Sequence, residues 1–343
     1  MQPLINVSQY KIFISGKPYN KYLQTLNDSD FKKKVISKTL CEEPNRANGT
    51  QLLRILFPHS KRLPAEALMV GGDYYPEIRG MSYNSAHDEL FLADWNNKVV
   101  RAMRVRDNAG DLRDVYRAPH DTSPILLSVC HMSDSDTLLV SSLEKGSDGK
   151  IAQWLVALSR NGSEWREAQR VQTEGKGWIS CALSDSRVLI GDDDSTYMEL
   201  FRVESGPCIA RVHRIHVPEK YEWFSATCGS DTLVAMSYTS YFSDKSVRVH
   251  RLRGDRLEEL ARIQLKEPHK LLWLVDRLLV ADYDSEKQSH AVIELEVSDT
   301  RLERRRELIA TSENINVHRL CAVNDGFAIF DNKTNDILHY SFT

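Results

Sequence analysis

The chain has 343 residues, with 45 Lys and Arg against 48 Asp and Glu, and a formal net charge of -3 at pH 7. Hydrophobic residues make up 41% and charged residues 27%, which is typical of a globular protein able to bury a large core. A mean hydropathy of -0.42 and the lack of a long apolar run argue against a membrane span, and the first residues hold no apolar signal core. We expect a cytoplasmic protein, or a secreted one whose signal was removed.

The N-terminal region differs in charge and pattern from the rest. Residues 1–67 contain 11 Lys and Arg against 5 Asp and Glu, so the remainder carries a net charge of -9. A hairpin is expected around Gly16 and a helix over 28–43, where apolar residues form one stripe. We interpret residues 1–62 as a basic extension packed on a domain formed by residues 63–343.

From residue 78 onward one pattern recurs, in which a short apolar strand, a polar turn and a second apolar strand follow each other. The second strands are spaced by 45 to 50 residues along the chain. Third strands are expected at 99–105, 151–158, 198–203, 247–252, 291–297 and 337–342, and fourth strands at 113–117, 166–171, 210–217, 257–265 and 304–309. Four short strands in each repeat of this length are typical of the blade of a β-propeller.

The last repeat stops at Thr343 after three strands, so a closed ring needs a fourth strand from elsewhere. The segment 63–70 stands directly before the first repeat, where a fourth strand would stand. Pro64 is compatible with this placement, because proline is tolerated in an edge strand. The sequence therefore predicts an all-β, six-bladed β-propeller that is closed by an N-terminal strand completing the last blade.

One hairpin gives a more specific resemblance. Residues 90–100, with the sequence LFLADWNNKVV, resemble the hairpin of NHL repeats, and residues 279–282 and 329–332 resemble it more weakly. The chain as a whole resembles six-bladed propellers of the NHL and TolB-like type. That resemblance implies the architecture and little about activity, since such propellers include hydrolases, lyases, RNA binders and peptide readers.

Four of the six cysteines fall at equivalent positions near the ends of first strands, namely Cys130, Cys181, Cys228 and Cys321. Cysteine often acts as a small buried hydrophobic residue. Equivalent positions in different repeats are expected to lie beyond the reach of a disulfide, so we interpret these residues as free thiols. Free thiols favour a reducing compartment. Five N-x-S/T sequons, which are glycosylation acceptors in secreted proteins, leave secretion as an alternative.

In a propeller, the loops before the first strands and after the second strands open on one face around the central channel. Aromatic residues with Arg and His on loops over a rigid scaffold are typical of binding surfaces. The candidate binding residues on this face are Tyr74, Tyr75, Arg79, Trp95, Trp178, Trp223, Tyr241, Asp192, Asp193, Asp194, His269, Lys270, Asp282, Asp284 and His318. For the repeated Asp residues a structural alternative stays open, because an Asp there commonly caps its own turn.

The absence of a catalytic signature favours a non-enzymatic scaffold that binds a protein or peptide, with basic side chains suiting the Asp-rich face. Such a scaffold needs no cofactor, and the sequence does not predict an oligomeric state. An alternative is a calcium-dependent hydrolase or lactonase resembling the senescence-marker and paraoxonase propellers, with Glu77, Asp192, Asp282 and Asn316 on the ion. A third reading is RNA binding, as in some NHL propellers, but the charge of -9 after residue 67 argues against a nucleic-acid partner.

Overall fold

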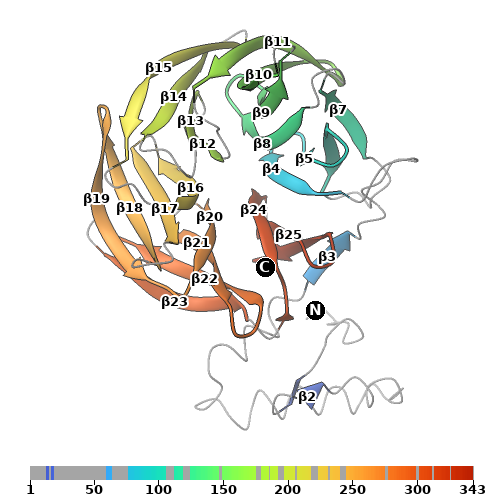
Figure 1. The fold of residues 1–343 in the computed structure, drawn as a ribbon. Coiled ribbons are helices and arrows are strands. Elements are labelled where there is room, and N and C mark those ends of the chain that lie inside the picture. Colours follow the sequence, from blue (N-terminus) through green and yellow to red (C-terminus); the bar gives the residue numbers. More distant parts are fainter. Residues whose placement is uncertain are drawn as a thin grey trace, which may run out of the picture. The chain divides into compact units, whose positions relative to one another are not determined.

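The structure is a computed structural model, and the residues that it describes are almost all in strands or in the turns between them (Figure 1). The described residues are 13–14, 17–18, 59–63, 76–105, 112–118, 124–146, 149–174, 179–184, 186–191, 197–204, 207–217, 223–230, 232–239, 245–274, 277–298, 301–310, 313–324 and 326–342. They contain no helix that is long and apolar enough to cross a membrane.

The chain divides into two compact units, one formed by Lys61–His339 and the other by Met1–Ser60 with Tyr340–Thr343. Strand β1 (Phe13–Ile14) pairs antiparallel with β2 (Lys17–Pro18), inside the hairpin predicted around Gly16. The helix predicted over 28–43 lies outside the described residues.

Within Lys61–His339, consecutive strands pair into four-stranded antiparallel sheets, as the repeat predicts. The first two sheets are β4 (Ile78–Asn84), β5 (Glu89–Asp94), β6 (Val99–Arg104) and β7 (Arg113–Arg117), then β8 (Ile125–Met132), β9 (Thr137–Lys145), β10 (Ile151–Asn161) and β11 (Glu164–Thr173). The next strands are β12 (Ile179–Ser184), β13 (Arg187–Gly191), β14 (Tyr197–Glu204) and β15 (Cys208–His216), then β16 (Trp223–Ser230), β17 (Leu233–Thr239), β18 (Lys245–Arg253) and β19 (Arg256–Gln264). A single parallel pairing of His216 with Arg256 joins these two sets at β15 and β19. The following sheet is β20 (Pro268–Leu274), β21 (Arg277–Asp284), β22 (Ser289–Val297) and β23 (Leu302–Ile309).

The last sheet takes its fourth strand from the N-terminal part of the chain. Its order is β24 (Val317–Val323), β25 (Gly326–Asp331), β26 (Asp336–Ser341) and β3 (His59–Leu63). Closure by an N-terminal strand is therefore confirmed. The described strand is 59–63, and residues 64–70 of the predicted segment lie outside the described residues.

The first strand of each sheet faces the centre of the ring (Figure 1). These inner strands are packed in the order β4, β8, β12, β16, β20 and β24, and β24 packs against β4 to close the circle. The prediction of an all-β propeller is thereby confirmed.

Burial is highest in the second strands of the sheets and lowest in the outermost, fourth strands. Every residue of β5 and of β25 is buried, whereas β11 and β23 expose much of their length. The apolar clusters join adjacent sheets; in one of them Phe91 and Val100 pack with Leu126 and Val140 of the next sheet. Burying one such side chain contributes about 1.5–3 kcal/mol, so each sheet is stabilised mainly by its neighbours.

Third strands also bury charged side chains, and each is paired with a residue from the fourth strand of its own sheet. The pairs, with N···O distances, are Arg101–Asp114 (3.2 Å), Glu199–Arg211 (3.1 Å), Arg248–Glu259 (3.2 Å) and Glu294–Arg306 (2.6 Å). The third-strand member is at most 4% exposed in every pair. A buried charge without a partner is strongly destabilising, so these pairs tie each outer strand to its sheet.

Candidate functional site

Several inner strands begin with the same irregularity. In β4, β20 and β24, the pairing with the second strand skips one residue, which is Arg79, His269 or His318 respectively. A bulge of this kind leaves a residue out of the ladder and redirects its side chain. Three neighbouring sheets of the ring therefore present a basic residue or histidine at the equivalent position. In two of them a second basic residue follows, Lys270 or Arg319.

Arg79, Lys270, His318 and Arg319 interact electrostatically, and we call these four residues the cationic sector. The guanidinium of Arg319 donates from Nε to the backbone oxygen of Arg79 and from Nη1 to that of His318, the latter at 2.7 Å. Burial, followed by the charge of Arg79, lowers the pKa of Arg319 to about 9, which still leaves it charged at neutral pH. Burial and then the charges of Arg319, Lys270 and Arg79 lower the pKa of His318 to about 2, so this ring is neutral.

Trp95 borders the cationic sector from the turn between β5 and β6. The guanidinium carbon of Arg79 lies 4.5 Å from the centroid of the Trp95 ring, in the geometry of a cation–π contact. Glu77 forms an ion pair with Arg79, and both side chains remain partly exposed, at 29% and 26%. Within the described part of the chain, the buried atoms Nε of Arg79 and Nε2 of His318 have no hydrogen-bond partner. Two predicted binding residues, Arg79 and Trp95, are thus brought together.

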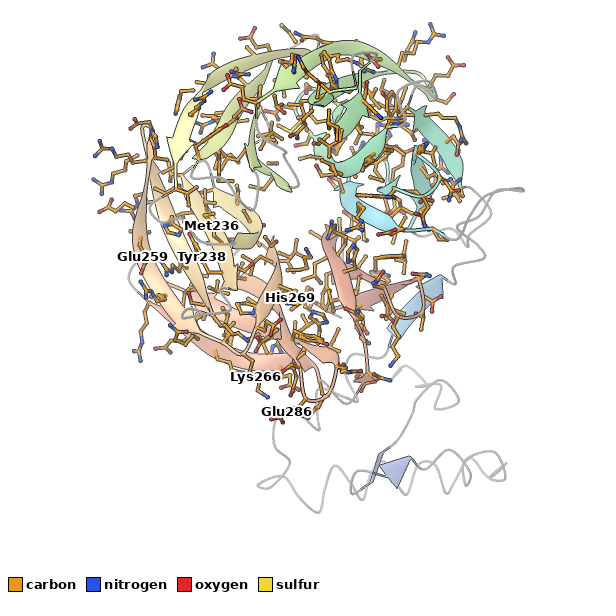
Figure 2. The ribbon with its side chains drawn as sticks, in the orientation of Figure 1. Met236, Tyr238, Glu259, Lys266, His269 and Glu286 are labelled. Carbon is orange, nitrogen blue, oxygen red and sulfur yellow. The ribbon has the colours of Figure 1, made fainter. Side chains whose placement is uncertain are left out.

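His269, labelled in Figure 2, belongs to a chain of hydrogen bonds that crosses two sheets. The N–H of Val317 donates to Nδ1 of His290 (3.2 Å), which leaves the proton of this ring on Nε2. That Nε2 donates to Nδ1 of His269 (3.0 Å), and Nε2 of His269 then donates to Glu267 (3.1 Å). Burial lowers the pKa of both histidines, that of His290 to about 3. Both ring nitrogens of His269 therefore have partners within the fold.

The Asp residues at the ends of second strands fasten the loops that lead into the first strands. Each accepts a backbone N–H from that loop: Asp94 from Glu77 (3.2 Å), Asp282 from Glu267 (2.7 Å) and Asp331 from Asn316 (2.9 Å). All three are buried, and burial raises the pKa of Asp94 and Asp282. The predicted cap of the residue's own turn is seen at Asp94, which accepts from the N–H of Asn97 (3.3 Å), and at Asp331, which accepts from that of Lys333 (3.1 Å). Asp282 accepts instead from Lys266 and Glu267, which precede β20.

Asp284 is also engaged within the fold. The residue is 3% exposed, and its carboxylate forms ion pairs with Lys266 (2.9 Å) and Lys287 (3.6 Å). The side-chain hydrogen bond to Lys266 is the largest effect that lowers the pKa of Asp284.

The residues predicted as calcium ligands do not form a ligand set where they are described. Glu77 pairs with Arg79, Asp282 accepts backbone N–H groups, and the N–H of Asn316 donates to Asp331. In the described ranges, no three His, Cys, Asp or Glu side chains are grouped so that they could hold a metal ion. The fourth predicted ligand, Asp192, is not among the described residues.

The remaining predicted binding residues stay predictions. Those outside the described residues are Tyr74, Tyr75, Trp178, Asp192, Asp193, Asp194 and Tyr241. Trp223 is the first residue of β16, where its backbone alone is described.

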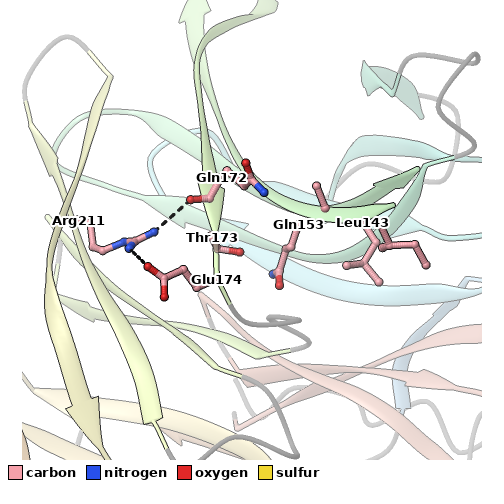
Figure 3. A pocket seen from close by; sticks show the side chains of 8 residues that line it. Leu143, Gln153, Gln172, Thr173, Glu174 and Arg211 are labelled. Atoms are coloured by element: carbon pink, nitrogen blue, oxygen red, sulfur yellow. Dashed lines mark hydrogen bonds and ion pairs between the residues drawn. The ribbon is translucent and has the colours of Figure 1, made fainter. Parts of the chain in front are cut away.

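The structure adds two features that sequence reasoning missed. A pocket of about 520 Å³ lies beside β9, β10 and β11, with Arg211 of β15 at its side (Figure 3). Ile151, which is 71% exposed, lines it, and an Arg211–Glu174 ion pair of 2.5 Å closes one side.

The second feature is a correction: Sγ of Cys228 lies 3.1 Å from Sγ of Cys181, so the expectation that thiols of different repeats are too far apart is wrong for this pair.

Comparisons with known proteins place the chain by fold. No protein-family model matches it, and no curated protein matches its sequence. A chain of the Mitotic Checkpoint Complex has a TM-score of 0.54 at 9% identity, over 82% of this chain and 93% of that one. The soluble aldose sugar dehydrogenase of Escherichia coli has a TM-score of 0.51 at 9% identity, over 81% and 98%. The PQQ-bound aldose sugar dehydrogenase of Streptomyces coelicolor has 0.50 at 8% identity, over 83% and 99%. At these identities the likeness shows a shared β-propeller fold, which is compatible with protein assembly and with catalysis alike.

Proposed function

We propose that the chain is a non-enzymatic binding module, and that an acidic segment of a protein partner binds to the cationic sector and to the adjoining Trp95. The observation that carries the proposal is the guanidinium of Arg319. It donates to two backbone oxygens and forms no ion pair with a carboxylate of the described residues. Glu77, whose charge acts on Arg319, is already paired with Arg79.

The sign of the partner's charge follows from the positive side chains that the cationic sector brings together, namely Arg79, Lys270 and Arg319. A basic partner was expected from the Asp residues of the loop face. Asp282 and Asp284 now have backbone and lysine partners, so they offer little to an incoming cation. The cationic sector supports an acidic partner instead, because a carboxylate can accept charge-assisted hydrogen bonds from Arg and Lys. Each such bond contributes about 1.5–3 kcal/mol.

Direct binding of labelled peptides tests this function. Fluorescence anisotropy would compare an eight-residue Glu peptide, the same peptide with Gln, the same peptide with Lys, and a single-stranded RNA of equal charge. We expect the Glu peptide to bind most tightly and its affinity to fall as salt is raised, because partly exposed charges are screened.

Two variants and one control locate the site. Lys270→Gln and Arg79→Gln should each weaken binding of the Glu peptide about tenfold, which corresponds to about 1.4 kcal/mol for one lost contact. Arg253→Gln removes the same charge from a side chain that is 64% exposed and pairs with Glu258, and it should bind as the wild type does. Equal binding of the Glu and Gln peptides would refute the proposal, as would equal losses in all three variants. If the RNA binds more tightly than the Glu peptide, the ligand of this site is a phosphate group and not an acidic peptide.

A further inference from the structure

Two cysteines meet across neighbouring inner strands that carry no part of the cationic sector. Cys181 lies on β12 and Cys228 on β16, 47 residues apart in the chain, and their sulfur atoms are 3.1 Å apart. Each sits in the body of its hairpin, where Cys181 pairs with Leu189 and Cys228 with Val234. Because β12 packs directly on β16, the two sulfurs are held together by the framework of the ring.

The surroundings of the pair are apolar, and one of its two members is partly exposed. Cys181 is 7% exposed and belongs to a cluster that includes Leu189, Val234 and Met236, against which Cys228 packs. Cys228 is only partly buried, so it is the member that a small solute reaches first.

We propose that Cys181 and Cys228 are a site of oxidative modification, and that a hydroperoxide converts them into a disulfide between β12 and β16. The thiolate of Cys228 attacks one peroxide oxygen, the O–O bond breaks, and a sulfenic acid and one water or alcohol are formed. The sulfur of Cys181 then attacks the sulfenic sulfur, the S–S bond forms, and the S–O bond breaks with release of water. Two thiols thus lose two electrons and two protons, and with hydrogen peroxide the products are one disulfide and two waters.

The movement needed is small and the chemistry is slow at neutral pH. A disulfide has an S–S length of about 2.05 Å, so the sulfurs approach by roughly 1 Å, a shift that side-chain rotation can supply. Burial, the contact with Cys181 and the charge of Cys130 raise the pKa of Cys228 well above its ordinary value. Since the thiolate is the nucleophile, the rate of disulfide formation should rise with pH across the range 7 to 9.

Peptide mapping of the full chain tests the proposal. The protein would be treated with hydrogen peroxide, blocked with N-ethylmaleimide and digested with trypsin without reduction. Trypsin releases Cys181 in peptide 177–187 and Cys228 in peptide 221–245, neither of which has an internal Lys or Arg. We expect these two peptides linked, two hydrogens lighter than their sum, with or without one oxygen on Met236, and separated by dithiothreitol.

Variants and stability measurements complete the test. Cys181→Ser and Cys228→Ser should each abolish the link, whereas Cys208→Ser should keep it, because Cys208 is an exposed cysteine on β15. Oxidised wild type should melt roughly 5 °C higher than the reduced protein, because a cross-link over a loop of this length restricts the unfolded chain. Three results would overturn the proposal: a link to Cys130, to Cys41 or to a second chain; sulfinic acid on Cys228 with Cys181 still reduced; or no modification at pH 9.

Discussion

Gly80 lies on the inner strand β4, directly against the backbone of the neighbouring inner strand β8. A Cβ atom at this position would lie 2.6 Å from the nitrogen of Val129, and 2.7 and 2.9 Å from Cα and C of Ser128. All three contacts are backbone atoms, so no side-chain rotation can relieve them. Gly80→Ala therefore requires β4 and β8 to separate by several tenths of an ångström around Gly80.

Overpacking of this kind costs about 1–3 kcal/mol, and we expect a value near the upper end because only the backbone can yield. For a domain of this size, a loss near 3 kcal/mol lowers Tm by about 5 °C. Thermal unfolding followed by circular dichroism, together with urea titration, measures both quantities on the full chain.

Gly254→Ala is the matched control for the added methyl group. A Cβ at Gly254 has no neighbour within 4 Å, and its φ of +62° leaves only backbone strain of about 1 kcal/mol. If Gly80→Ala is no more destabilising than Gly254→Ala, the close approach of β4 and β8 is wrong, and with it the reasoning from inner-strand packing.

Two further predictions concern buried ionisable groups. Burial lowers the pKa of His250 to about 4. The unfolded chain takes up this proton near pH 6.5 and the folded chain does not, so as pH falls from 6.5 to 4 the group removes about 1.4 kcal/mol of stability per pH unit. Urea titrations should show a shallower pH dependence for His250→Gln and an unchanged one for the exposed His216→Gln; equal slopes in both would contradict the burial argument. Glu294→Gln leaves three neighbouring arginines without their shared carboxylate and should cost about 3 kcal/mol by urea titration. Glu303→Gln, whose side chain is 52% exposed in a pair with Arg301, should cost under about 1 kcal/mol, and a similar loss in both variants would refute the reading.

The fold was largely predictable because second strands such as Glu89–Asp94 are buried along their whole length and recur at a nearly constant spacing. The described part of the closing strand was harder to predict. Strand β3 has the sequence HSKRL, which has no apolar alternation, so its strand conformation comes from pairing with β26 and not from a local pattern.

The candidate site was only partly predictable. Arg79, Lys270 and His318 stood out as polar residues at strand entries, whereas Arg319 reads as an ordinary strand position until the bulge at His318 is known. The role of Asp282 depends on a backbone N–H 15 residues earlier in the chain, at Glu267. Such relations depend on strand register, which a single sequence specifies poorly.

The buried ion pairs of the outer strands have a consequence for how a chain of similar repeats avoids mispairing. In the three consecutive sheets that begin with β12, β16 and β20, the buried third-strand charge is negative at Glu199, positive at Arg248 and negative at Glu294, and each fourth strand carries the opposite sign. A third strand that paired with the fourth strand of an adjacent repeat of opposite polarity would bury two like charges. The alternating polarity of these three sheets thus favours pairing of each outer strand with its own sheet over pairing with a neighbouring one.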